Sequence, residues 1–334
     1  MPRARTDRSS PQAFWVLLAL VVVLALAAQA PQRDARPVSA HRTAAAAPPY
    51  RGVVAPTLTP VVAPRPPAGP LAAAELPGGG TRIFADRRLL VAYYGTAGSG
   101  ALGVLGEAPP EQIVPRLVRA AAPFARTGRP VQPVFELIVT VAHASPTRTG
   151  TYSSNIPRRQ VQRYLAAAHR HGVLVVLDLQ PGRADFLDVA KSWEWALRDP
   201  WVGLALDPEW RMGPHGVPGR RIGSVSAAEV NRVSAWLDGL TARQGLPEKV
   251  FMLHQFRPEM IRHVERVRDR EHLALVQHVD GFGTPGEKLA TYHRVVRPLQ
   301  FALGFKLFYD EDVHRMRPAR VLAIRPRVSF VSFQ

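Results

Sequence analysis

The chain has 334 residues, of which 46% are apolar and 21% charged, a composition typical of a globular protein rather than a disordered one. Its formal net charge of +17 comes almost entirely from arginine. This charge either favours acidic partners, such as anionic polymers, or reflects a GC-rich genome. The absence of cysteine excludes disulfide bonds, thiolate metal sites and thiol catalysis.

The first 30 residues have the layout of a secretory signal. Arg3, Arg5 and Arg8 form a basic patch, and the run from Ala13 to Ala28 is apolar without a break. This run is shorter than the about 20 residues that span a bilayer, but it is within reach of an uncleaved anchor. We therefore expect residues 1–30 to be a signal peptide or a signal anchor, and the rest of the chain to be extracytoplasmic.

Two expectations about partners follow from export. Because an exported protein seldom meets DNA, we expect no nucleic-acid partner. The membrane is expected as a partner only if the amino-terminal segment stays uncleaved.

Residues 31–80 are rich in proline and alanine and show no apolar periodicity. Prolines recur every few residues, in stretches such as A-P-R-P-P-A-G-P. This composition predicts a disordered, semi-extended linker that separates the membrane or wall layer from a folded domain.

From residue 81 to 334, short apolar runs alternate with segments of helical period. The runs are hydrophobic throughout rather than at alternate positions, which is typical of strands buried on both faces. They comprise residues 89–95, 134–142, 173–179, 202–207, 250–256, 273–280, 301–309 and 328–333.

Helix start signals lie between these runs. Capping-box patterns begin at Ser226 and Thr284, and Pro-Glu pairs at Pro110 and Pro258 indicate two further helix starts. Eight strands with intervening helices in about 250 residues predict an α/β fold, a (β/α)8 TIM barrel. The alternative, an open doubly wound sheet, would leave unpaired edges that an even count of eight does not need.

In a TIM barrel the chemistry lies at the carboxyl ends of the strands. The predicted strands end in polar residues although their beginnings are almost wholly apolar. Packing alone does not explain this, since each buried polar group would need a partner. We expect the site to include Tyr94, Asp178, Asp207, Glu209, Trp210, His254, Gln255, Gln277, Asp280, Lys306 and Tyr309.

The fourth run ends in L-A-L-D-P-E-W, residues 204–210. By strand alternation, Asp207 and Glu209 share the face of Gly203 and Ala205, and these small residues suit the crowded interior of a barrel. Asp178 points inward from the neighbouring third strand by the same alternation. Three carboxylates so close cannot all ionise easily, so at least one pKa should rise, as a general acid requires.

A barrel with Asp-x-Glu at the end of its fourth strand resembles the exported glycoside hydrolases of the chitinase and muramidase type. The resemblance implies that Glu209 is the acid that protonates the glycosidic oxygen and that Asp207 is its partner. It also implies that Tyr309 contacts the acetamido group and that Trp210 stacks on a sugar. We expect the substrate to be a wall or environmental glycan, or another anionic wall polymer.

The chain departs from both patterns. The chitinase series D-x-x-D-x-D-x-E reads here V-G-L-A-L-D-P-E, and the first strand reads V-A-Y-Y-G, without the aspartate that muramidases carry there. The identity of a second catalytic group therefore stays open, with Asp178 as the candidate.

Three other interpretations remain. Asp207 can be a turn residue that caps the loop after Pro208. The barrel can be a non-catalytic, wall-associated glycan-binding protein, whose carboxylates would be held in arginine pairs. A metal-dependent hydrolase would bring several of the strand-end histidines and aspartates together, although no H-E-x-x-H spacing is present. We expect a monomer without a cofactor or metal.

Overall fold

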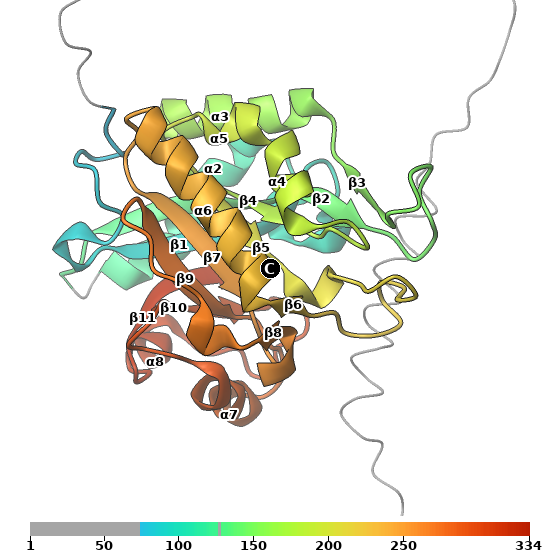
Figure 1. The fold of residues 1–334 in the computed structure, drawn as a ribbon. Coiled ribbons are helices and arrows are strands. Elements are labelled where there is room, and N and C mark those ends of the chain that lie inside the picture. The colour runs from blue at the N-terminus through green and yellow to red at the C-terminus, as the bar shows by residue number, and fades with distance from the viewer. Residues whose placement is uncertain (1–73, 126–127) are drawn as a thin grey trace, which may run out of the picture. The chain divides into compact units, whose positions relative to one another are not determined.

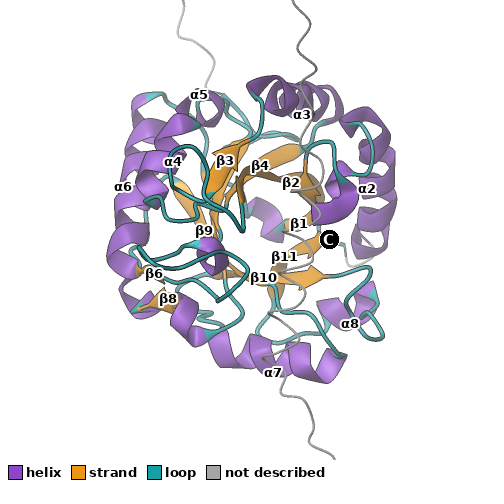
Figure 2. Cartoon of the chain, turned by 90° about the vertical axis from the view of Figure 1, so that its right-hand side faces the viewer, coloured by secondary structure: helices purple, strands orange, loops and turns teal. Residues whose placement is uncertain are grey.

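The computed structural model describes residues 74–125 and 128–334. The expected signal segment, 1–30, and residues 31–73 of the expected linker lie outside the described residues. In the described part, eight parallel strands form one closed barrel with helices around it (Figures 1 and 2). The predicted (β/α)8 barrel is therefore confirmed.

The barrel closes because β1 pairs in parallel with both β2 and β11. The order around it is β1-β2-β4-β5-β7-β9-β10-β11. These strands are β1 (Leu89–Thr96), β2 (Val131–Ala142), β4 (Leu174–Leu179), β5 (Val202–Leu206), β7 (Lys249–His254), β9 (Leu273–Val279), β10 (Ala302–Leu307) and β11 (Val328–Phe333). Each agrees with one of the eight predicted runs. A short β3 (Ser153–Asn155) adds antiparallel to β2, and β6 (Val225–Ser226) pairs with β8 (Ile261–Arg262) outside the barrel.

The helices occupy the outer ring seen in Figure 2. They are α2 (Pro110–Ala125), α3 (Arg158–His171), α4 (Phe186–Ser192), α5 (Glu194–Leu197), α6 (Ala227–Arg243), α7 (Pro285–Val295) and α8 (Pro318–Leu322). Thr284 and Glu287 form the complete capping box predicted for α7. At Ser226 only half of the box forms, because the Glu229 carboxylate bonds to the Phe186 backbone and to Arg211 instead.

The prediction that a helix starts at Pro258 is wrong. Pro258–Met260 forms a single 3-10 turn, and the chain then becomes extended in β8. Pairing of Ile261 with Val225 takes this segment out of the helical layer. No α-helix of the described chain follows β11 either. Its outer face is covered by α2, where the Phe124 ring lies 6.3 Å from the Phe333 ring.

The amino-terminal end of the barrel is closed by residues that precede β1. Leu76 and Ile83 are buried at 3% and 1% exposure and pack with Leu174, Val250 and other interior side chains. The Trp201 indole also donates a hydrogen bond to the Glu75 carbonyl. The folded part thus begins several residues before Thr81, within the segment that composition assigns to the linker.

The barrel interior has an apolar lower layer and a polar upper layer. Near the amino ends of the strands, Ala92, Val134, Met252 and Phe330 belong to one buried cluster. One alternation further along the strands, the inward residues are polar and fully or almost fully buried: Tyr94, Glu136, Asp178, His254, His278, Lys306 and Ser332. Two members of this polar layer, Tyr94 and Lys306, also line a pocket at the carboxyl end of the barrel. No helix within residues 74–125 and 128–334 is both long and apolar enough to cross a membrane.

Candidate active site

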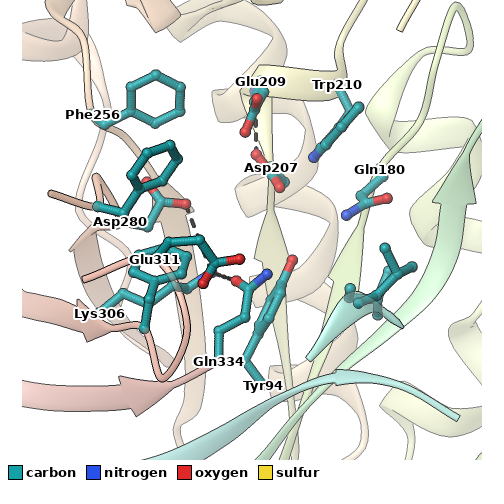
Figure 3. A pocket seen from close by; sticks show the side chains of 14 residues that line it. Tyr94, Gln180, Asp207, Glu209, Trp210, Phe256, Asp280, Lys306, Glu311 and Gln334 are labelled. Carbon is teal, nitrogen blue, oxygen red and sulfur yellow. Dashed lines mark hydrogen bonds and ion pairs between the residues drawn. The ribbon is translucent and has the colours of Figure 1, made fainter. Parts of the chain in front are cut away.

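A pocket opens at the carboxyl end of the barrel (Figure 3). Its polar lining includes four carboxylates, and its apolar lining is largely aromatic. The lining residues are Tyr94, Leu102, Ile138, Gln180, Asp207, Glu209, Trp210, Phe256, Asp280, Phe282, Lys306, Phe308, Glu311 and Gln334. An apolar pocket with a few convergent polar groups is the usual form of a small-ligand site.

Asp207 and Glu209 both line this pocket, but not as successive residues of a strand. β5 ends at Leu206, and Pro208 begins a 3-10 turn, Pro208–Trp210. Asp207 caps this turn, because its Oδ1 accepts a hydrogen bond of 3.2 Å from the Glu209 amide. Asp207 is thus both a turn cap and a pocket carboxylate, and Pro208 places Glu209 by bending the chain rather than by extending the strand.

The environment of Glu209 keeps its carboxyl group protonated near neutral pH. Burial and the nearby Asp280 carboxylate raise the pKa of Glu209 to about 8, against the attraction of Lys306 and His254. The pKa of Asp207 is also raised, by burial and then by Asp178. The expectation that crowding raises at least one carboxyl pKa therefore holds at this strand end.

Asp280 contacts two basic groups. Its Oδ2 lies 2.9 Å from Nδ1 of His254 and 3.9 Å from Nζ of Lys306. Burial alone would raise its pKa, but the hydrogen bond and charge of His254 lower it below its ordinary value. Asp280 therefore presents an ionised carboxylate to the pocket that also contains the protonated Glu209.

Lys306 is held at the floor of the pocket. Its Nζ lies 3.5 Å from the centre of the Tyr94 ring and 3.3 Å from Oε1 of Gln334. Lys306 also forms an ion pair with Asp280, at the upper end of the distance range for such pairs.

Directly beneath the floor lies a cluster with no exposed surface. His254 Nε2 is 3.1 Å from Glu136 Oε1 and 3.9 Å from Asp178 Oδ1, and Tyr94 donates a 2.8 Å hydrogen bond to Asp178 Oδ2. Glu136, His254 and His278 each offer one ligand atom, and these atoms lie within 4.8 Å of one another. They are the residues of the described chain that are placed to hold a metal.

This placement corrects the expectation that Asp178 and His254 contact the substrate. Each is 0% exposed and lies below the pocket rather than on its wall. Asp178 is separated from the pocket by Tyr94, and burial raises its pKa to about 6. His254 reaches the pocket only through Asp280.

Three further residues that were expected to contact the substrate face away from the pocket. They are Gln255, Gln277 and Tyr309. Gln277 Nε2 bonds to Gln255 Oε1 and to the Val295 carbonyl, in the layer between the barrel and its helices. Strand alternation explains this, because their neighbours His254 and His278 take the inward positions. Tyr309 also lies outside, stacked on Phe333 with 5.6 Å between the rings and hydrogen-bonded to Tyr93.

The residues of the expected set that do line the pocket are Tyr94, Asp207, Glu209, Trp210, Asp280 and Lys306. The sequence interpretation missed the aromatic wall of Phe256, Phe282 and Phe308, and also Glu311. It also left out Glu136, which lies inside the polar layer because β2 begins at Val131. A lone acid in an otherwise apolar run was the signal that could have identified it.

Comparison with known proteins does not assign the chain to a family. No family model matches the chain, and no curated protein matches it. Among solved structures, it is similar to a hyperthermophilic endo-beta-1,4-glucanase in complex with substrate, at 9% identity and a TM-score of 0.31. That match covers 61% of this chain and 77% of the glucanase chain. A similarity at this TM-score defines neither the fold nor an activity of this protein.

Proposed function

We propose that this protein is a glycoside hydrolase in which Glu209 is the general acid. The observation that supports this most directly is the pairing, in one pocket, of a carboxyl group with a pKa of about 8 and an ionised carboxylate, Asp280. Glycosidases use two carboxyl groups whose environments push their pKa values apart.

In this mechanism Glu209 donates its proton to the glycosidic oxygen as the bond to the leaving sugar breaks. Asp280 stabilises the positive charge that develops on the sugar ring, or activates the attacking water. Lys306 and His254 hold Asp280 in its ionised form. Asp207 fixes the turn that carries Glu209.

The pocket walls suit a carbohydrate. Trp210, Phe256, Phe282 and Phe308 supply flat apolar surfaces beside the carboxylates. Aromatic faces of this kind bury the C–H faces of a sugar ring, while carboxylates and amides accept hydrogen bonds from its hydroxyl groups. We assign the sugar-stacking role to Trp210, which lies next to Glu209 in the same turn (Figure 3).

The pattern of ion pairs favours catalysis over binding alone. A binding barrel would hold its pocket carboxylates in arginine pairs. In residues 74–125 and 128–334, no arginine lies within ion-pair distance of Asp207, Glu209 or Asp280. The arginine pairs of the described chain involve other acids, such as Glu229 with Arg211 and Asp185 with Arg232.

We further propose that the enzyme acts outside the cytoplasm on a wall or environmental glycan. The basic apolar amino terminus supports export, and the net charge of +17 supports adhesion to anionic polymers.

The test is hydrolysis of a panel of N-acetylated and unsubstituted glycans by the full-length chain and by Glu209→Gln. The variant keeps the size of the side chain but cannot donate a carboxyl proton. We expect it to lose about 100-fold to 10,000-fold in kcat, the usual contribution of a general acid. Glu259→Gln, at an exposed glutamate outside the pocket, is the matched control. Equal hydrolysis of any substrate by wild type and Glu209→Gln would show that the assignment of Glu209 is wrong.

A further inference from the structure

The buried cluster below the pocket has a distinctive pattern of hydrogen bonds. In the described chain, the fully buried side-chain atoms without a hydrogen-bond partner belong to this cluster and to Asp280, which contacts it from the pocket: Glu136 Oε1 and Oε2, Asp178 Oδ1, His254 Nε2, His278 Nδ1 and Asp280 Oδ1. Buried polar atoms are normally satisfied, and a group of unsatisfied ones in a single place indicates a bound ion or ordered water.

His254, His278 and Asp178 each have one atom held by a hydrogen bond and another without a hydrogen-bond partner. His254 is anchored through Nδ1 by Asp280, His278 through Nε2 by Ser332, and Asp178 through Oδ2 by Tyr94. This is the arrangement of metal ligands, in which an outer partner fixes the orientation of the ring or carboxylate whose other atom binds the ion.

The contact between His254 and Glu136 points in the same direction. Nε2 and Oε1 are 3.1 Å apart and form an ion pair when His254 is protonated. Two ligand atoms on one tetrahedral cation are about 3.3–3.6 Å apart, given metal–ligand bonds of about 2.0–2.2 Å. The most distant ligand atoms of Glu136, His254 and His278 are within 4.8 Å, so they need to approach by about 1 Å to share an ion.

The charges of the contact network also fit a divalent ion. Glu136, Asp178 and Asp280 supply three carboxylates, and Lys306 supplies one positive charge. A dication that displaces the proton of His254 leaves both histidines neutral and brings the sum to zero. Two imidazoles with a carboxylate suit zinc and its first-row neighbours, whereas calcium and magnesium prefer oxygen ligands.

We propose that Glu136, His254 and His278 bind one divalent first-row transition-metal ion beneath the pocket, with Asp178 beside it as the third carboxylate. The ion joins β2, β7 and β9 and, through His254, fixes the position of Asp280. Its role is to hold the pocket floor, and the proposal does not depend on the reaction proposed for Glu209.

The first experiment uses the full-length wild-type chain. We expect about one equivalent of a transition metal per chain by elemental analysis, loss of that metal to a strong chelator, and a lower melting temperature of the stripped protein. Re-addition of Zn²⁺ should restore the melting temperature, and Mg²⁺ should not. A folded, stripped protein that binds none of Zn²⁺, Mn²⁺, Fe²⁺, Co²⁺ and Ni²⁺ would overturn the proposal.

The second experiment compares Zn²⁺ affinity among variants by competition with a chromogenic chelator. Glu136→Gln and His278→Gln should lose more than about 100-fold, and Ser332→Ala, which removes only the outer partner of His278, about 10-fold. His143→Gln is the control, because His143 lies at the same end of the barrel but bonds to Ser154.

If Glu136→Gln and His278→Gln fail to fold, the wild-type measurement and Ser332→Ala still test the site. Unchanged affinity in all three cluster variants would place the metal at surface histidines such as His169 and His171, and would overturn the proposal. Metal content and melting temperature do not depend on any glycan, so this outcome leaves the hydrolase proposal intact, and failure of the hydrolase proposal leaves the metal site intact.

Discussion

The carboxylate of Asp280 lines the pocket, while its Oδ2 lies 2.9 Å from Nδ1 of His254, a side chain with no exposed surface. This hydrogen bond connects the solvent-facing pocket with the buried polar layer of the barrel. It keeps Asp280 ionised and restricts its orientation. The second carboxyl group of the proposed reaction is therefore positioned by a residue that the substrate cannot touch.

Asp280→Asn should abolish most of the activity. The amide is the same size but cannot carry the negative charge that stabilises the transition state. We expect kcat on the hydrolysed glycan to fall by at least about 100-fold while KM changes little. The measurement is steady-state kinetics, with Asp310→Asn at an exposed position as the control. A proportional rise in KM with unchanged kcat would instead assign Asp280 to substrate binding.

The activity should fall as the pH rises through about 8. Glu209 must be protonated to act as an acid, and its pKa is raised to about 8 by burial and by Asp280. The carboxyl group is thus active below this pH and inactive above it. A pH profile of kcat/KM should show this descending limb. A descending limb near the ordinary glutamate pKa of about 4.3 would contradict the role of Glu209.

The raised pKa of Glu209 also predicts how the stability of the protein depends on pH, and this prediction does not depend on the substrate. Between the ordinary pKa of a glutamate and about 8, folded Glu209 keeps a proton that the unfolded chain releases, so the free energy of unfolding decreases as the pH rises across this range. Glu209→Gln has no such proton to lose. We expect the difference in melting temperature between the variant and wild type to grow in favour of the variant from pH 5 to pH 8, measured by thermal unfolding.

The fold was predictable because a parallel barrel repeats one strong signal. Eight strands buried on both faces must be hydrophobic throughout, and each of the eight runs matches an observed strand closely. The predicted helix at Pro258 failed because the Pro-Glu signal is local. The pairing of Ile261 with Val225, which replaces the helix, joins residues far apart in sequence.

The site was predictable only in part, for a geometric reason. Strand-end position identified Asp207, Glu209, Asp280 and Lys306, but it does not distinguish inward from outward residues. Gln255 and Gln277 follow and precede inward histidines and therefore face the helices. The sequence also does not show how deeply a strand-end side chain is buried. Asp178 lies at the end of its strand, yet it is buried under Tyr94. The aromatic wall comes from loops, for which the sequence has no periodic signal.

Gly304→Ala should destabilise the barrel. Gly304 is the neighbour of His278 across β9 and β10, and a Cβ atom there would lie 2.2 Å from His278 Nδ1. The His278 ring would have to move within a packed interior, which typically costs about 1–3 kcal/mol. Gly286→Ala is the matched control, because a Cβ atom at Gly286 meets no atom within 4 Å. Chemical denaturation measures both, and equal stability of the two variants would mean that His278 is free to shift.

Leu76→Ala should reveal that the folded domain starts before residue 81. Leu76 is 3% exposed and packs with Ile83 at the amino-terminal end of the barrel. Removal of a buried leucine side chain typically costs about 2–5 kcal/mol, because both apolar burial and close packing are lost. Leu299→Ala makes the same chemical change at a fully exposed leucine, so it should leave the free energy of unfolding within about 0.5 kcal/mol of wild type. The comparison uses denaturant unfolding of the full-length chain. If Leu76→Ala were as stable as Leu299→Ala, the segment before Thr81 would not contribute to the core.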